Sequence, residues 1–309
     1  MKKIILSLLV LSIFGCAQID RQSPQEIGAT GNVHAAMTGP EVVNLLTNLY
    51  NQTLQNCNNS VTAPAFLCSG VTLRVTDKQP GETHHVWNPS QTSVKNGGVS
   101  FSYLRVDANM GRLAWGKNNG FMLYPIFGAP VDKIDLDYLC SFPIDGWTWN
   151  RTTPCGHHAS YPSQSQRCRS AGVTTAEQWK SVWDSSPSNQ HIRQCGFDVS
   201  EATGKPASVP FYQSVRARGM LGVAGLNEQN EIVIKTWPQN LQNTLPLMAF
   251  FFIAGGDNAG LAEARNNQKD FRDSTTARIW VPVIRLIPPS TMGGKASFQY
   301  VASDQLVLP

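Results

Sequence analysis

Six cysteines restrict the folds open to this chain more than any other feature of its sequence. They occupy the middle of the chain, at Cys57, Cys68, Cys140, Cys155, Cys168 and Cys195. Upstream, Lys2 and Lys3 precede the apolar run Ile4–Phe14, which is typical of a secretory signal peptide and too short to span a bilayer as a mature helix. An even number of cysteines in an exported chain predicts a framework of disulfides.

Cysteines that neighbour one another along the sequence suggest the pairs Cys57–Cys68, Cys140–Cys155 and Cys168–Cys195. A metal site is the competing interpretation, but the chain has no CxxC or HxxxH spacing, which would place metal ligands together. The adjacent pairs His84-His85 and His157-His158 would face opposite ways on a strand. We therefore expect three disulfides and no bound metal.

Cys16, the remaining cysteine, lies directly after the apolar run. The stretch Ile13-Phe14-Gly15-Cys16 resembles a bacterial lipobox, and Ala17 after it resembles the outer-membrane sorting of Gram-negative lipoproteins. Lipidation of Cys16 would tether a soluble domain to a membrane; ordinary signal cleavage near Cys16-Ala17-Gln18 is the alternative. We expect a signal peptide at 1–15, a tether at 16–39, and an exported protein that is secreted or anchored in the outer membrane through lipid.

The remaining chain, 40–309, is expected to form a single catalytic domain. The sequence is 41% hydrophobic, with 8 Trp and 13 Phe, which can fill a sizeable core. Residues 140–195 are rich in Ser, Pro and Gln and are expected to form a loop-rich insertion that disulfides hold in place. The formal charge falls from +4 to +2 without Lys2 and Lys3, which is too small to indicate a nucleic-acid partner.

Hydrophobic periodicity predicts both helices and strands in this domain. We expect helices at 40–56, 174–183, 210–219 and 256–274, with Thr174 capping the second and Glu177 at the capping-box distance. We expect strands at 71–76, 99–106, 121–126, 231–236, 247–254, 280–287 and 298–301. Because helices and strands do not alternate regularly, the predicted fold class is α+β, with mainly antiparallel strands in two packed sheets and flanking helices.

Polar side chains interrupt three of the expected strands. Arg74 lies on an apolar strand, where its charge must be paired within the protein or offered to an anion. Ser100 and Ser102 point to one face of the next strand, which suits either a binding site or a solvated edge. Gln229 and Glu231 lead into a later strand, where they suit either a hairpin turn or a catalytic pair.

In this order, these residues resemble the Arg, Ser-x-Ser/Thr and Gln/Glu-x-Glu motifs of the ADP-ribosyltransferase family. Longer segments resemble the exported halovibrin proteins of marine and plant-associated Gram-negative bacteria: AFLCSGVTLR, HHVWNPS, SVKNGGVSFSYLR, CSFPIDGW, NQHIRQCGFDV and VPVIRL. The resemblance implies an ADP-ribosyltransferase-like fold with disulfide-pinned loops, and an enzyme that cleaves the nicotinamide–ribose bond of NAD⁺. Such an enzyme is a NAD⁺ glycohydrolase or a mono-ADP-ribosyltransferase that modifies a protein acceptor, with NAD⁺ as substrate and no bound cofactor.

The resemblance also implies roles for individual residues. Cleavage of the bond develops positive charge on the ribose, so Glu231 would stabilise the transition state electrostatically, and Gln229 would orient the nucleophile. Arg74 would hold the phosphates of NAD⁺ by charge-assisted hydrogen bonds. Ser100, with Ser102 beside it, would orient the ribose or Glu231.

Aromatic and basic neighbours complete the expected substrate-binding set. Tyr103 or Trp237 would stack on nicotinamide, and Arg105, close to Asp107, is a reserve phosphate binder. Asp145 in the segment CSFPIDGW is interpreted as a turn former, which is the commoner role of a single carboxylate in a loop.

A non-enzymatic interpretation stays open beside this one. The chain would then be a disulfide-stabilised envelope lipoprotein that acts as a binding or adhesion module, with merely solvated polar strand faces. The sequence has no GxSxG, HExxH or P-loop motif, which argues against common hydrolase and kinase classes. Arg74, Ser100 and Glu231 discriminate between the two interpretations, because an enzyme needs them in one cleft.

Overall fold

The structure is a computed structural model that describes most of the chain from residue 37 onward. The described residues are 37–52, 69–76, 83–113, 118–124, 138–185, 195–199, 208–222, 228–237, 246–253, 259–275, 278, 280–291, 293–300 and 302. The signal segment, nearly all of the tether with Cys16, and the pair Cys57–Cys68 lie outside these residues. Within them, no helix combines the length and the apolar character needed to cross a membrane.

Most of the strands join one large sheet, in the order β12-β11-β10-β3-β1-β2-β9-β4-β8. Their bounds in that order are Ser297–Gln299, Val283–Ile287, Leu247–Ile253, Asn119–Leu123, Val71–Val75, Gly98–Leu104, Glu231–Lys235, Tyr138–Phe142 and Phe197–Asp198. Neighbouring strands pair antiparallel, except that β10 and β11 run parallel. With the helices, this arrangement confirms the α+β class and the mainly antiparallel pairing.

A second, small sheet has the order β5-β6-β7, with bounds Thr148–Trp149, His157–His158 and Tyr161–Ser165. The expectation of two packed sheets is therefore met in number only, because the large sheet takes most of the strands. The strands form one large sheet because β2 pairs with β9. In this pair, Val99 lies opposite Ile234 and Phe101 lies opposite Ile232. The pair joins the strands from β12 to β2 with the strands from β9 to β8 in one continuous sheet.

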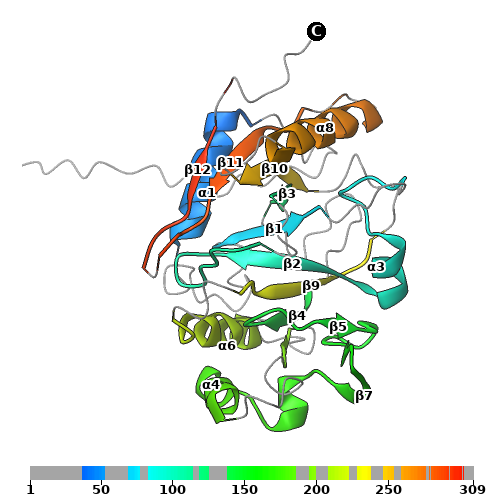
Figure 1. Cartoon of the computed structure of the whole chain (residues 1–309), viewed down its shortest axis with the longest axis vertical. Helices are drawn as coiled ribbons and strands as arrows, with labels where there is room; N and C mark the ends of the chain where they lie inside the picture. Colours follow the sequence, from blue (N-terminus) through cyan, green and yellow to red (C-terminus); the bar gives the residue numbers. More distant parts are fainter. Residues whose placement is uncertain are drawn as a thin grey trace, which may run out of the picture.

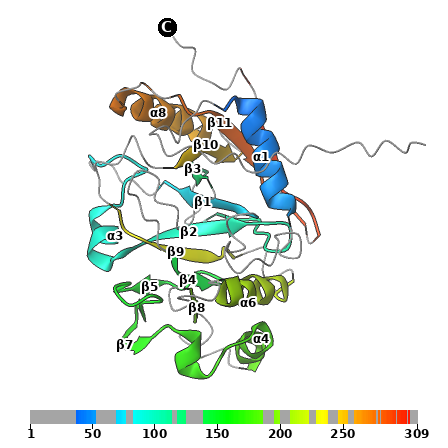
Figure 2. The same ribbon diagram turned by 180° about the vertical axis from the view of Figure 1, so that it is seen from behind.

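Helices cover the large sheet along its length (Figures 1 and 2). At one end, α1 (Gly39–Asn51) packs on β12, β11 and β1, and α8 (Ala259–Ser274) packs on β10, β3 and β11. At the other end, α6 (Ser208–Gly219) packs on β8 and β4, and α4 (Ala176–Ser185) packs on α6. The short helix α3 (Gln91–Asn96) lies against β2.

Strand β10 shows how an uninterrupted apolar run serves two cores. Phe250 belongs to the core that includes Phe271 of α8, whereas Phe251 belongs to the core that includes Leu46 of α1. Successive side chains of a strand point to opposite faces, so a strand buried on both faces reads as continuously apolar. This is why the sequence predicts the position of β10 well.

Several helix boundaries differ from the prediction: α4 is Ala176–Ser185 instead of 174–183, and α6 begins at Ser208 instead of 210. The helix expected at 40–56 ends at Asn51, where Gln52 takes an extended backbone conformation. In α4 the capping box forms one residue later than expected: the Thr175 hydroxyl accepts from the Gln178 N–H, and the Gln178 side chain accepts from the Thr175 N–H. The prediction that Thr174 is the cap was wrong, because the glutamine at the third helical position can make the same reciprocal pair as a glutamate.

Two of the predicted disulfides are present. Cys140–Cys155 ties β4 to the turn before β6, and Cys168–Cys195 ties the short 3-10 helix η2 (Cys168–Ala171) to the segment before β8. The segment 140–195, expected to be rich in loops, contains the small sheet and α4, and most of β4 with them. Strand β4 is an integral strand of the large sheet, between β9 and β8.

Candidate active site

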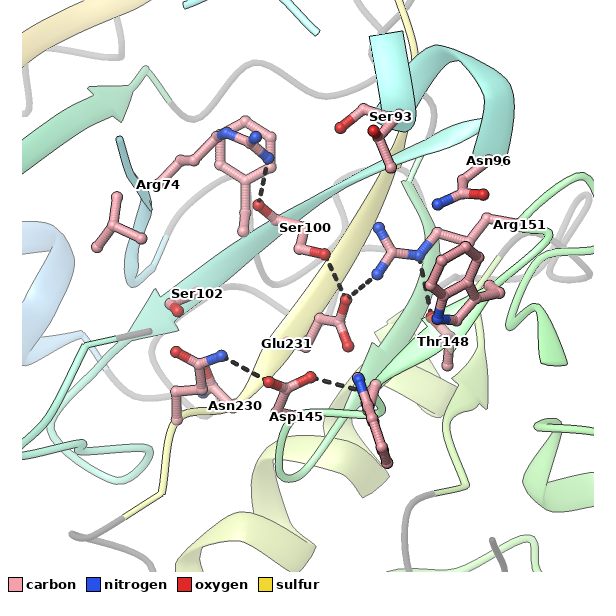
Figure 3. Close-up of a pocket in the computed structure, with 16 residues that line it drawn as sticks. Arg74, Ser93, Asn96, Ser100, Ser102, Asp145, Thr148, Arg151, Asn230 and Glu231 are labelled. Atoms are coloured by element: carbon pink, nitrogen blue, oxygen red, sulfur yellow. Dashed lines mark hydrogen bonds and ion pairs between the residues drawn. The ribbon is translucent and has the colours of Figure 1, made fainter. Parts of the chain in front are cut away.

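A pocket of about 240 Å³ lies where β1, β2 and β9 face the small sheet. Arg74 from β1, Ser100 from β2 and Glu231 from β9 all line it (Figure 3). Ser102 and Gln229 line it as well. Three segments that are far apart in the sequence therefore meet in one cleft, because β1, β2 and β9 are consecutive strands of the large sheet.

Glu231 is the most deeply buried acid of this pocket, with 2% of its surface exposed. The Ser100 hydroxyl donates to Glu231 Oε1 at 2.6 Å, and Arg151 Nη2 donates to the same oxygen at 2.7 Å. The Gly146 N–H donates to Oε2 at 2.9 Å. Burying a charge is costly unless it is paired and hydrogen-bonded, and these three donors meet that requirement and fix the carboxylate in place.

The register of β2 against β9 explains why Ser100 and Glu231 meet. Ser100 lies opposite Val233, and Phe101 lies opposite Ile232. Opposed side chains of an antiparallel pair share a face, and successive side chains alternate between faces. Ser100 and Glu231 are thus diagonal neighbours on the pocket face, while Phe101 and Ile232 point into the core on the other face.

Asn230 determines where β9 begins. Its Oδ1 accepts from the Tyr103 N–H at 2.8 Å, and its Nδ2 donates to the Tyr103 carbonyl at 2.7 Å. The buried amide side chain replaces the pair of backbone hydrogen bonds that a further ladder residue would make. Glu231 consequently occupies the first position of a paired strand, and the turn interpretation of this stretch applies only to the residues before it.

Arg151 lines the pocket but is not among the candidates that the sequence offered. Its Nε donates to Thr148 Oγ1 at 2.9 Å and its Nη1 donates to the Gly98 carbonyl at 3.2 Å, which directs Nη2 toward Glu231. The ion pair spans 80 positions of the sequence. Arg151 lies in a segment with no helix or strand periodicity, so no local pattern singles it out; only the tertiary contact reveals it.

Asp145 is a second carboxylate in the pocket, and its role extends beyond forming a turn. Its Oδ1 accepts from the Trp147 N–H at 2.9 Å, which is the expected turn contact, and its Oδ2 accepts from Gln229 Nε2 at 2.9 Å. Burial and the negative charge of Glu231 raise the pKa of Asp145 to about 6, although both hydrogen bonds act in the opposite direction. A carboxyl group with such a pKa in a pocket is a candidate for proton transfer.

Arg74 supplies a second guanidinium to the pocket. It is 6% exposed, and its Nη1 donates to the Ser100 carbonyl at 3.1 Å. A guanidinium is suited to bind phosphate or carboxylate through several donors at once. Ser102, on the same face of β2 as Ser100, lines the pocket beside it.

Two exposed tryptophans also line the pocket. Trp147 is 48% exposed and Trp149 is 52% exposed. Trp147 has a φ of 46°, an unusual backbone conformation for a bulky residue; its N–H is bound by Asp145, and its ring packs edge-on against His158 at 5.5 Å. Exposed aromatic side chains at a pocket suit the binding of a planar ligand ring.

Tyr103 and Trp237 do not reach the pocket, so the expected stacking of either ring on nicotinamide is corrected. Both side chains lie in the hydrophobic core with Phe101, and the Tyr103 hydroxyl donates to the Ser69 carbonyl at 2.8 Å. The reason is the alternation along β2: Tyr103 points to the same side as Phe101, away from Ser100.

Arg105 is also placed away from the pocket. Its side chain is 0% exposed and forms an ion pair with Asp107, and its Nη1 donates to the Ser69 hydroxyl at 3.1 Å. The protein itself uses this charge, so Arg105 is no reserve binder for phosphate. Among the residues that the structure describes, no three His, Cys, Asp or Glu side chains gather in a way that could hold a metal ion.

No family model matches the chain, and no curated protein or solved structure is significantly similar to it. The function must therefore be argued from the geometry and chemistry of the pocket itself.

Proposed function

We propose that this protein is an enzyme that cleaves the nicotinamide–ribose bond of NAD⁺, with an ADP-ribosyltransferase-like fold. The observation that carries the proposal is the convergence of Arg74, Ser100 and Glu231 from three consecutive strands on one pocket. A binding module with solvated strand faces does not need a carboxylate that is 2% exposed and held by three donors. An enzyme that must stabilise a developing positive charge does need such a fixed carboxylate.

Glu231 would supply that stabilisation. The ribose gains oxocarbenium character as the bond to nicotinamide breaks. A carboxylate already fixed at the start of a paired strand stabilises this charge without reorganising at the moment of reaction. Nicotinamide leaves as a neutral molecule, so the reaction needs no strong general acid.

Other pocket residues would bind the two ends of the substrate. Arg74 would bind a phosphate by charge-assisted hydrogen bonds. Trp147 or Trp149 would stack on the nicotinamide ring, in place of the core residues that the sequence suggested. A pocket of about 240 Å³ suits one end of a dinucleotide rather than the whole molecule.

Hydrolysis is the favoured outcome over transfer to a protein. Gln229 Nε2 is committed to Asp145 at 2.9 Å, so the amide has one fixed orientation that suits a small nucleophile such as water. Mono-ADP-ribosyl transfer to a protein side chain is the second outcome of the same chemistry. We include export in the proposal, with secretion or outer-membrane anchoring through lipid on Cys16.

The experiment is to incubate the purified domain with NAD⁺ and to measure free nicotinamide by chromatography. Glu231→Gln keeps the shape of the side chain and removes its charge, so release should fall on the order of 10²–10³-fold, the usual cost of losing one electrostatic partner in a transition state. Glu263→Gln is the matched control, because Glu263 is an exposed residue of α8 and should leave the rate unchanged.

Two outcomes would contradict the proposal. A folded Glu231→Gln protein that releases nicotinamide at the wild-type rate would remove Glu231 from the chemistry. A folded wild-type domain that releases none above buffer would favour the binding module. Thermal melting of each variant separates loss of activity from loss of folding.

A further inference from the structure

Asp145 has no part in the reaction as described so far, yet it lines the same pocket as Glu231 (Figure 3). The two residues that follow it bind both carboxylates: the Gly146 N–H donates to Glu231 and the Trp147 N–H donates to Asp145, each at 2.9 Å. A Cβ on Gly146 would lie 2.6 Å from the ring of Phe142, so only glycine lets the backbone at this position pack so closely against that ring. One loop therefore sets the positions of the two acids relative to each other.

The two carboxylates have different surroundings. Glu231 is deeply buried and receives a charged donor, Arg151 Nη2. Asp145 is only partly buried, and its two donors, the Gln229 amide and the Trp147 N–H, are neutral. An acid paired with a guanidinium suits electrostatic stabilisation, whereas a less deeply buried acid with neutral donors suits proton transfer.

Gln229 fixes the orientation of Asp145. Because its Nε2 donates to Asp145, its Oε1 points elsewhere, and this buried oxygen has no hydrogen-bond donor among the described residues. The amide thereby holds the Asp145 carboxylate at the wall of the pocket. A water in the pocket that donates one O–H to Asp145 keeps a lone pair for attack.

We propose that Asp145 is the general base of hydrolysis, a role that rests on the proposed cleavage of NAD⁺. The water oxygen bonds to C1′ of the ribose as the C1′–N bond breaks, and nicotinamide leaves with that electron pair as a neutral molecule. One proton of the water passes to the Asp145 carboxylate, which then releases it to solvent. NAD⁺ and water thus give nicotinamide, ADP-ribose and one proton.

Several charged groups surround the pocket that Asp145 lines. Glu231 of β9 and the cations Arg151 and Arg74 line the pocket with it, and Arg218 of α6 donates to the Pro143 carbonyl at 3.2 Å behind its loop. Burial and Glu231 raise the pKa of Asp145 to about 6, close to the range in which a general base works best at neutral pH. Hydrolysis should therefore decline below about pH 6 as Asp145 becomes protonated.

The test is Asp145→Asn, with nicotinamide release as the readout. Asparagine keeps an acceptor oxygen but takes no proton, so hydrolysis should fall about 10²–10⁴-fold. Azide is an anionic nucleophile that needs no base, so it should restore release in this variant and give azido-ADP-ribose, which mass spectrometry detects. Azide should not rescue Glu231→Gln, because that variant lacks the charge that stabilises the ribose cation.

Two further measurements make the outcome decisive. Asp184→Asn, which removes an exposed acid of α4 paired with Lys180, should leave the rate unchanged. The kcat/KM of the wild type should fall below about pH 6, and this profile needs no variant to fold. The base assignment alone is overturned if the wild type cleaves NAD⁺ without this decline. It is also overturned if a folded Asp145→Asn variant hydrolyses NAD⁺ at the full rate, or if azide fails to restore nicotinamide release in that variant. A wild type that releases no nicotinamide overturns the proposed function together with it.

Discussion

Arg151 Nη2 lies 2.7 Å from Glu231 Oε1, although the two residues are 80 positions apart in the chain. Glu231 begins β9 of the large sheet, and Arg151 follows β5 of the small sheet. The side chains are 11% and 2% exposed, respectively. This buried ion pair joins the two sheets at the pocket, so the stability of the protein and the position of its proposed catalytic carboxylate depend on the same contact.

Arg151→Met should lower the free energy of unfolding by about 3–5 kcal/mol, because it leaves the buried Glu231 carboxylate without its cation. Adding Glu231→Gln should recover part of this loss, because the double variant has no unpaired charge. Urea unfolding of the two single variants and the double variant measures both effects. Lys180→Met is the control: it breaks an exposed pair with Asp184 and should cost less than ~1 kcal/mol. Equal losses in the two Met variants would contradict the buried-pair interpretation.

The two disulfides should contribute similar stability but differ in their effect on activity. Their sequence separations are 15 and 27, so replacing either cysteine pair with alanine should cost about 2–5 kcal/mol. Cys140–Cys155 ties β4 to the turn that carries Arg151, whereas Cys168–Cys195 lies beside α4. Nicotinamide release, assayed where both variants remain folded, should fall only when Cys140–Cys155 is removed. A larger fall without Cys168–Cys195 would show that the pocket is not positioned by the first disulfide.

Trp147→Ala or Trp149→Ala should weaken substrate binding more than it slows the chemical step. Loss of one stacked ring costs about 1–2 kcal/mol, which corresponds to a KM for NAD⁺ that is roughly 5–30-fold higher. Steady-state kinetics separates KM from kcat. Trp183→Ala serves as the control, because this ring stacks on Trp179 at 5.4 Å within the α4 region. An unchanged KM in both pocket variants would exclude the tryptophans as a binding platform.

Asp145 should cost stability when it ionises. Burial, with the charge of Glu231, raises its pKa from 3.8 to about 6, so the folded chain binds this proton more tightly than the unfolded chain. The free energy of unfolding should then decrease as the pH rises from about 4 through about 6. Asp145→Asn removes this dependence, so its gain in Tm over the wild type should be larger at about pH 7.5 than at about pH 4. Melting curves at the two pH values check the sign, and an equal difference at both would contradict the raised pKa.

Local patterns in the sequence predict much of this fold. The apolar run at 247–254 identifies β10, and the polar-to-apolar change at Glu231 locates the start of β9. Cysteines close in sequence are the ones that pair in Cys140–Cys155 and Cys168–Cys195. Short loops bring such neighbours together at low entropic cost, which is why adjacency along the chain is informative here.

Alternation along β2 also contains information that the functional interpretation did not use fully. The sequence separates Ser100 and Ser102 from Phe101 by strand geometry, and the same period places Tyr103 with Phe101. The structure follows this rule, with Tyr103 in the core. A role for Tyr103 in the pocket conflicted with a pattern already visible in the residues.

Local sequence patterns locate seven strands of the large sheet, β1, β2, β3, β9, β10, β11 and β12, but miss β4 to β8. They also show which side chains of β2 share a face, and they mark Arg74, Ser100 and Glu231 as candidates for a common site. Only the packing of distant segments shows that Arg151 pairs with Glu231, that Gln229 donates to Asp145, and that Arg105 pairs with Asp107 inside the protein. The physical reason is the distance along the chain over which each interaction acts. Propensity and periodicity act over a few residues, whereas the partner of a buried charge is set by strand register and by how distant segments pack.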